Sequence, residues 1–125
     1  MNRAVPAVAA LALLTGCAPA PRAVVSPVAD QARVGLTEWQ IAVAPPAALP
    51  GQITLNVTNA GSTAHDLRVD GAIEPASVPV LEPGQTATLT VQAKPGGDLR
   101  LWCGVPGHRQ AGMDAMVQVT EGAGT

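Results

Sequence analysis

The residues best suited to chemistry lie in one short segment near the C-terminal end of the chain. Within Leu101–Met113, a cysteine, a histidine and a methionine follow one another at five-residue intervals, as Cys103, His108 and Met113. A thiolate, an imidazole and a thioether belong to the ligand set of a blue-copper centre, which also needs a second histidine. The sequence contains one further histidine, His65. These four residues therefore predict a site for one copper ion that changes between Cu(I) and Cu(II).

The residues around the predicted ligands suit a site made by loops between strands. Cys103 follows a predicted strand and Met113 precedes another, so a single loop could supply three ligands. The second histidine lies at the start of a different predicted strand. Gly107 and Gly112 directly precede two of the predicted ligands. Glycine tolerates the tight turns with positive φ that would fold these side chains back onto one ion.

After residue 38, short segments alternate apolar and polar residues between turns rich in glycine and proline. This period of two is typical of half-buried strands, and no long stretch has the period of a helix. The predicted strands are Trp39–Val43, Gln52–Thr58, Asp66–Val69, Thr86–Gln92, Leu99–Trp102 and Ala115–Thr120. Many short strands separated by such turns favour an all-β sandwich or barrel.

The composition is that of one folded domain. The chain has 125 residues, of which 47% are hydrophobic and 13% charged, and this excludes a typical disordered protein. Its net charge is only −2 and the sequence has no cluster of basic residues, so nucleic acid is not expected as a partner. The sequence has no Phe or Tyr, so aliphatic side chains must form the core. We expect the two tryptophans, Trp39 and Trp102, to serve mainly in packing.

The first 16 residues have the character of an export signal. A basic residue precedes the apolar run Ala4–Leu14, and the following Thr15-Gly16-Cys17 completes a segment that resembles the bacterial lipobox. We therefore expect residues 1–16 to be a signal peptide and Cys17 to carry a lipid that anchors the protein to a membrane. Plain secretion, or a disulfide between Cys17 and Cys103, is the alternative.

The remaining boundaries follow from composition. Residues 17–34 are rich in Ala, Pro and Val, and this composition predicts an extended tether after the lipidated cysteine. Residues 35–122 are predicted to form the copper-binding domain, and residues 123–125 a short tail. This organisation predicts an exported protein, lipid-anchored on the periplasmic or extracellular face of the cell envelope.

The loop Cys103-Gly-Val-Pro-Gly-His108-Arg-Gln-Ala-Gly-Met113 resembles the copper loop of small bacterial and archaeal cupredoxins, which are related to plastocyanin, halocyanin and sulfocyanin. The segment Asn56–Leu67, in which a strand ends near Asn-x-Gly and leads into a histidine, resembles the family's other ligand segment. The resemblance implies a Greek-key cupredoxin β-sandwich of about six to eight strands. The sequence departs from the family in lacking its common core Phe residues and in placing Trp102 where Tyr or Phe usually precedes the cysteine.

The resemblance also implies a role for each ligand. His65, Cys103 and His108 would form the equatorial plane, with Met113 as the weak axial ligand. In relatives, the backbone amide after the first histidine donates a hydrogen bond to the cysteine sulfur. Asp66 would therefore act next to the ligands and tune the reduction potential.

We expect a carrier of single electrons, not an enzyme, because a site that suits both Cu(I) and Cu(II) need rearrange little. Electrons would pass through the ring of His108, where redox donor and acceptor proteins would dock. The surrounding apolar patch would consist of Val105, Pro106, Ala111 and Gly112. Loss of Arg3 with the signal leaves six basic and nine acidic residues, 6 − 9 = −3, so strong electrostatic steering of a partner is not expected.

Several alternatives stay open from the sequence alone. A copper chaperone or storage lipoprotein would bind the same metal and deliver it to another envelope protein. A hydrolase using Cys103 and His108 would lack an orienting residue and leave Met113 without a role. Met116 competes with Met113 as axial ligand, although its alternation with neighbouring valines favours a position within a strand. Zinc is disfavoured because a thioether is a poor zinc ligand.

Overall fold

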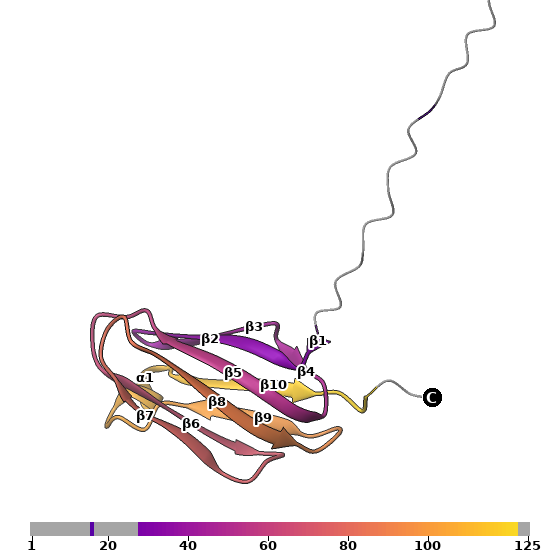
Figure 1. Ribbon diagram of the computed structural model, residues 1–125. Helices are drawn as coiled ribbons and strands as arrows, with labels where there is room; N and C mark the ends of the chain where they lie inside the picture. The colour runs from indigo at the N-terminus through magenta and orange to yellow at the C-terminus, as the bar shows by residue number, and fades with distance from the viewer. Residues whose placement is uncertain (1–15, 17–27, 123–125) are drawn as a thin grey trace, which may run out of the picture.

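The computed structural model describes Gly16 and residues 28–122, and residues 28–122 form a sandwich of two β-sheets with one short helix (Figure 1). The elements are β1 (Val28–Ala29), β2 (Gln31–Thr37), β3 (Gln40–Ala44), β4 (Ala47–Ala48), β5 (Gly51–Asn59), β6 (His65–Gly71), β7 (Ala76–Leu81), β8 (Thr86–Ala93), β9 (Asp98–Trp102), α1 (His108–Ala111) and β10 (Asp114–Val119). One sheet has the order β1-β4-β10-β9-β6-β7 and the other the order β3-β2-β5-β8. The predicted all-β Greek-key sandwich is confirmed.

The strand pairings bring several chain segments to one end of the sandwich. Strands β2 and β3 form an antiparallel hairpin, and β2 runs parallel to β5, with Leu36 opposite Asn59. In the other sheet, β9 pairs antiparallel with both β6 and β10. The β2–β3 turn, the β5–β6 connection and the β9–β10 loop therefore lie at the same end. Figure 1 shows α1 at this end and β1 at the opposite one.

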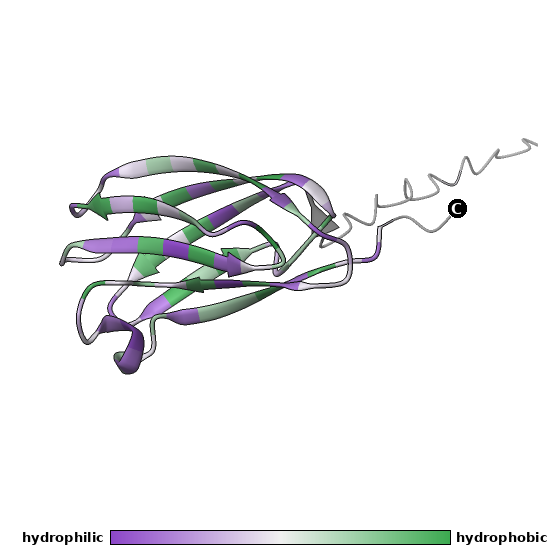
Figure 2. Cartoon of the chain, turned by 90° about the horizontal axis from the view of Figure 1, so that it is seen from below, coloured by the Kyte–Doolittle hydropathy of each residue, from purple (hydrophilic) through white to green (hydrophobic). Residues whose placement is uncertain are grey.

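The core is built from aliphatic side chains that alternate along the strands. Buried and exposed residues alternate strictly in β9, and β5 buries every second residue from Ile53 to Asn59. Figure 2 shows this alternation of apolar and polar residues along the strands, and a hydrophilic α1. The largest fully buried aliphatic side chains come from both sheets: Leu36, Ile53, Leu55, Leu67, Leu99 and Leu101. Burying one such side chain contributes about 1.5–3 kcal/mol, so this core can form without Phe or Tyr.

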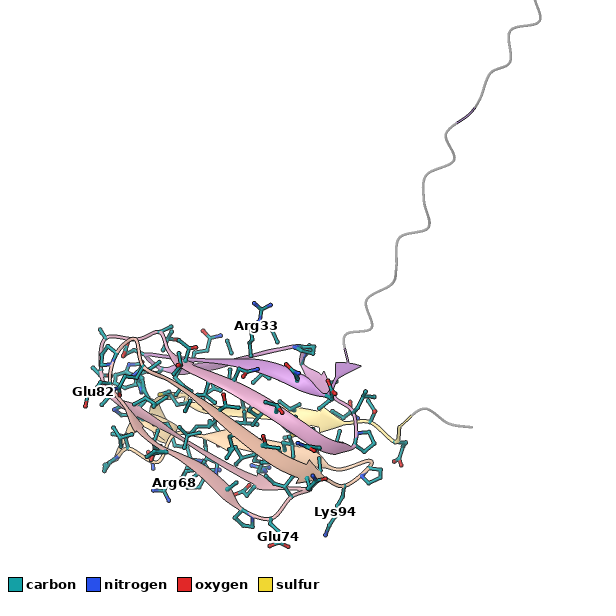
Figure 3. All side chains as sticks on the ribbon, viewed as in Figure 1. Arg33, Arg68, Glu74, Glu82 and Lys94 are labelled. Carbon is teal, nitrogen blue, oxygen red and sulfur yellow. The ribbon has the colours of Figure 1, made fainter. Side chains whose placement is uncertain are left out.

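Apart from the buried Asp66, the charged side chains of the described residues lie on the outside of the sandwich. Figure 3 shows the side chains of Arg33, Arg68, Glu74, Glu82 and Lys94 pointing away from the two sheets. Within residues 28–122, no helix has the length and apolar character needed to cross a membrane. Residues 1–15 of the predicted signal peptide and Cys17 lie outside the described residues.

The folded domain begins earlier than the sequence predicted. Residues 31–37 form β2, whose alternating burial places Ala32, Val34 and Leu36 in the core, although the composition predicted a tether up to residue 34. The prolines that precede this segment made it look like part of the tether. The last of them, Pro27, stands before the first described strand, so no proline interrupts β2. The tether expected from residue 17 can therefore extend no further than the start of β1.

Four further elements were not predicted: the two-residue strands β1 and β4, strand β7 and helix α1. The last two were missed for different physical reasons. Strand β7 contains Pro79, which usually argues against a strand, but β7 is an edge strand where a missing N–H is tolerated. Helix α1 is a single turn of four residues, too short to produce a helical period in the sequence.

Asn59, the last residue of β5, organises the connection that leads to His65. Its side chain is fully buried and makes three hydrogen bonds. The amide nitrogen donates to the carbonyl oxygens of Thr63 at 2.9 Å and Leu81 at 2.8 Å, and the side-chain oxygen accepts from the Gly61 amide at 2.9 Å. The Asn-x-Gly segment is thus a turn fixed by a side chain that mimics backbone.

Replacing Asn59 by Ala removes all three of these hydrogen bonds and leaves buried backbone groups without partners. We expect the free energy of unfolding of the metal-free protein to fall by roughly 2–4 kcal/mol, as measured by urea denaturation. Asn56→Ala is the matched control, because Asn56 is an exposed residue of the same strand whose side chain has only a 3.5 Å contact with Thr88. Equal stability losses in the two variants would contradict this account of the turn.

Candidate metal centre

The structure brings His65, Cys103 and His108 together at one end of the sandwich. One ligand atom of each residue lies within 4.8 Å of the others. The two histidine rings present the same atom to each other, with 3.1 Å between His65 Nδ1 and His108 Nδ1. The sulfur of Cys103 lies 3.6 Å from His108 Nδ1. Two imidazole nitrogens and one sulfur therefore surround a common point.

These three residues come from separate elements. His65 is the first residue of β6, Cys103 directly follows β9, and His108 begins α1. The side chains of His65 and Cys103 are buried, whereas His108 is only half-buried. The sandwich thus encloses two of the three groups and leaves the third at its surface.

Met113 lies directly beside this cluster. Its amide donates to the His108 carbonyl and its carbonyl accepts from the Cys103 amide, each at 3.1 Å. Met113 is fully buried, while Met116 is 56% exposed on β10. The geometry of the loop therefore puts the Met113 backbone against two residues of the cluster and turns the Met116 side chain towards solvent.

Glycine allows the two sharp turns of the β9–β10 loop. Gly107 has φ 85° and Gly112 has φ 129°, values that other residues adopt only with strain, as the sequence predicted. A side chain at Gly112 would also collide with the fold, because a Cβ atom there would lie 2.8 Å from the Trp39 carbonyl oxygen. Gly112 thus permits close contact between this loop and the β2–β3 turn.

The sulfur of Cys103 is buried and receives backbone hydrogen bonds. Burial raises the pKa of the Cys103 thiol above its ordinary value, while amide hydrogen bonds from Val105 and Asp66 oppose this rise. The Asp66 backbone therefore lies close enough to the sulfur to affect its pKa. At neutral pH the metal-free cysteine is a neutral thiol, and a metal must displace its proton in order to bind the thiolate.

The side chain of Asp66 connects β6 to the β9–β10 loop. His65, Asp66 and Leu67 are all buried, so the strand loses its alternation at its first residues. The Asp66 carboxylate accepts a short hydrogen bond from the Gly104 amide and lies 3.6 Å from Arg68 Nε. The hydrogen bond from Gly104 fixes the backbone just after Cys103. The negative charge of Asp66 also lies beside the sulfur and further raises the pKa of the Cys103 thiol.

The sequence did not identify Glu38, which lies in the β2–β3 turn. Its Oε1 atom is 3.0 Å from His65 Nε2, and the same carboxylate accepts from the amides of Ser62 and Thr63. Hydrogen bonds from the hydroxyl and then the amide of Thr63 are the main reason why the pKa of Glu38 falls to about 2. Glu38 is therefore an anion next to His65 throughout the physiological pH range.

Trp39 was expected in packing but lies at the surface, beside the histidines. It is 45% exposed, and its ring centroid is 4.8 Å from that of His108 in an edge-to-face arrangement. Neither Glu38 nor Trp39 gave a signal in the sequence, because both reach the site through the pairing of β2 with β5. A sequence pattern does not reveal contacts between segments that lie so far apart along the chain.

Trp102, which precedes the cysteine, lies on the outer face of the larger sheet. Its indole nitrogen donates to Asp70 at 3.3 Å, and the guanidinium groups of Arg68 and Arg109 lie 5.5 Å and 4.4 Å from its ring. The half-buried ring therefore contacts two cations, and packing accounts for its position.

The donor atoms present at this site fit copper. A cysteine sulfur and two imidazole nitrogens converge, and a buried thioether side chain belongs to the same loop. Soft sulfur and imidazole donors suit copper, whereas magnesium and calcium require carboxylate, carbonyl or water oxygens. The Glu38 carboxylate is hydrogen-bonded to Nε2 of His65, on the opposite side of the ring from the shared point.

Comparison with solved structures identifies the fold of the chain. No protein-family model matches the sequence, and no curated protein sequence matches it. A dithionite-reduced auracyanin from the photosynthetic bacterium Roseiflexus castenholzii is similar to this chain with a TM-score of 0.56 and 18% identity, over 76% of this chain and 98% of that one. Auracyanin A from Chloroflexus aurantiacus, described as a "blue" copper protein, is similar with a TM-score of 0.53 and 13% identity, over 74% and 99% of the two chains. A multicopper oxidase is similar with a TM-score of 0.58 and 16% identity, over 78% of this chain but only 45% of the oxidase. The chain therefore has the cupredoxin fold.

Proposed function

We propose that this protein, which has the cupredoxin fold, binds one copper ion and carries single electrons outside the cytoplasm. The observation that carries the proposal is the convergence of one ligand atom each from His65, His108 and Cys103 within 4.8 Å, with His108 Nδ1 3.1 Å from His65 Nδ1 and 3.6 Å from Cys103 Sγ. Together with Met113, these residues would supply the donor set of a blue-copper centre. A bound copper ion supplies a one-electron couple between Cu(I) and Cu(II).

The protein's own residues would keep this couple fast. The ligands come from a rigid sandwich and from a loop whose ends are hydrogen-bonded between Cys103 and Met113. A ligand frame that changes little between two oxidation states lowers the barrier to electron transfer. Burial of His65 and Cys103 keeps water away from the donors.

His108 is the proposed route for the electron, because it is the half-buried member of the cluster. The residues around its ring are exposed and mostly uncharged: Pro106, Gly107, Ala111 and Gly112, with Trp39 beside them. The nearest basic residue, Arg109, is paired with Asp114 at 2.7 Å. A redox donor and an acceptor would therefore dock here mainly through apolar contact, with little electrostatic steering.

An electron carrier explains the site better than delivery or catalysis. A delivery protein needs an exchangeable site, and three of the four proposed ligands, His65, Cys103 and Met113, have at most 1% of their surface exposed. The oxidase with a similar fold is more than twice as long as the segment matched here. Within residues 28–122, the cluster of His65, Cys103 and His108 is the one group of three or more potential ligands of this type.

The proposed lipid anchor at Cys17 is compatible with docking at His108. The first described strand, β1, lies at the end of the sandwich opposite to α1 (Figure 1). A chain that continues from β1 to a lipid at Cys17 would leave the copper end free to meet a partner. Two acyl chains would hold the protein at a membrane surface without a transmembrane helix.

Anaerobic addition of one equivalent of Cu(II) to the metal-free protein should produce an intense visible band from thiolate-to-copper charge transfer. Cys103→Ser should abolish this band and still fold, because serine is close in size to cysteine. Since burial raises the pKa of the Cys103 thiol, copper uptake at pH 7 should also release about one proton, and the serine variant should not. An equally intense band in Cys103→Ser would refute the ligand assignment, and a colourless, readily chelated wild-type complex would favour delivery.

Met113→Gln should lower the reduction potential, because a hard amide oxygen favours Cu(II) more than a thioether does. We expect a shift on the order of 60 mV, equivalent to a tenfold change in a one-electron equilibrium, as measured by protein-film voltammetry. Met116→Gln is the matched control, because Met116 is exposed on β10. A larger shift in the control than in Met113→Gln would exclude Met113 as the axial ligand.

Mass spectrometry of the membrane fraction should detect a mature N-terminus at Cys17 that carries acyl chains. Cys17→Ser removes the acylated sulfur, so we expect the variant to lose the acyl mass and to leave the membrane fraction. Wild-type protein without any acyl mass would contradict the proposed anchor and favour plain secretion.

A further inference from the structure

The Glu38 carboxylate connects the β2–β3 turn with the segment that leads to His65. It accepts hydrogen bonds from the Ser62 amide at 3.0 Å, from the Thr63 amide at 2.9 Å and from the Thr63 hydroxyl at 2.8 Å. The fourth partner is His65 Nε2, at 3.0 Å. Glu38 is thus hydrogen-bonded to two residues of the β5–β6 connection and to the first residue of β6, which is a proposed copper ligand.

The backbone is shaped to admit this carboxylate. A Cβ atom at Gly61 would lie 2.5 Å from Glu38 Oε1, so only glycine leaves room for the carboxylate over this part of the connection. On the other side of the turn, the Trp39 carbonyl lies where Gly112 lacks a side chain. The turn is therefore packed against both segments that supply the proposed ligands.

The contact with Glu38 determines which nitrogen of His65 carries the proton. A carboxylate is an acceptor only, so His65 Nε2 must be the protonated nitrogen and must donate to Glu38. In a neutral imidazole the other nitrogen then has a free lone pair. That nitrogen, Nδ1, lies 3.1 Å from His108 Nδ1, which in turn lies 3.6 Å from the sulfur of Cys103.

We propose that Glu38 is a positioning residue of the copper site, which fixes His65 in the tautomer and ring orientation that present Nδ1 to the metal. This inference rests on the proposed function. A carboxylate bonded to a ligating histidine also makes the ring a stronger donor and adds negative charge near the metal. Both effects favour the oxidised, more highly charged ion and lower the reduction potential.

The test uses Glu38→Ala, which removes the acceptor and the charge, and Glu38→Gln, which keeps an oxygen acceptor but removes the charge. Glu74→Gln is the control, because Glu74 is exposed, points away from the sandwich (Figure 3) and lies between β6 and β7, at the far end from His65. The tautomer of His65 is measured in the metal-free protein by long-range ¹H–¹⁵N correlation. Copper affinity and the reduction potential are then measured on the copper-loaded variants.

In wild type and Glu74→Gln we expect His65 to be protonated on Nε2. In Glu38→Ala we expect a mixture of tautomers, a 10–100-fold loss of copper affinity and a higher reduction potential. Glu38→Gln should keep the Nε2–H tautomer through its amide oxygen and still show a higher potential, because the charge is lost.

A residue that only supported the backbone of Ser62 and Thr63 would lower stability on substitution without changing the tautomer or the potential. Wild-type tautomer and potential in Glu38→Ala would therefore overturn the proposal. If Glu38→Ala does not fold, an unchanged potential in Glu38→Gln overturns it instead. Failure of the wild-type protein to show a thiolate band would reject the copper assignment, while the metal-free tautomer measurement would still decide the role of Glu38.

Discussion

Two imidazole rings lie with their Nδ1 atoms 3.1 Å apart, beside the sulfur of the buried Cys103, and this close approach is what the surrounding structure must maintain. Buried polar atoms that lie this close together are unfavourable unless each has a hydrogen-bond partner or they share an ion. Here the partners come from outside the cluster. Glu38 accepts from the far side of His65, and the amides of Asp66 and Val105 donate to the Cys103 sulfur. The remaining lone pairs converge on one point.

The sandwich maintains this arrangement by bringing three connections to one end. The β5–β6 connection is fixed by Asn59, the β9–β10 loop by the contacts of Met113, and the β2–β3 turn by Glu38. Each connection contacts at least one of the others, so a displacement of one displaces its neighbour. Preorganisation of this kind means that the ligand positions are set by folding and not by the metal. It also explains how a small domain with an aliphatic core can keep a rigid site.

Local chemistry made much of this predictable from the sequence. The spacing of Cys103, His108 and Met113, with glycines before two of them, indicated a tight loop, and the structure contains that loop with positive φ at both glycines. The alternation around Met116 correctly placed it on an exposed face of a strand. The five-residue spacing did not reveal α1, because a single helical turn has no period of its own.

The features that were missed depend on contacts between distant segments. Glu38 meets His65 only because β2 lies parallel to β5, and parallel pairing leaves no local signature in the sequence. Strand β7 was missed because Pro79 is acceptable only at an edge, and the edge position is a property of the assembled sheet. The core of β2 was hidden by the proline-rich composition before it. Sequence therefore predicted the donors, and the structure was needed to identify the groups that orient them.

The most direct test of the central claim is X-ray absorption at the copper edge, measured on the fully oxidised and fully reduced protein. We expect one short copper–sulfur distance and two imidazole nitrogens in both oxidation states, with little change between them. A first shell of oxygen and nitrogen alone, or loss of the sulfur or of one imidazole on reduction, would contradict the account.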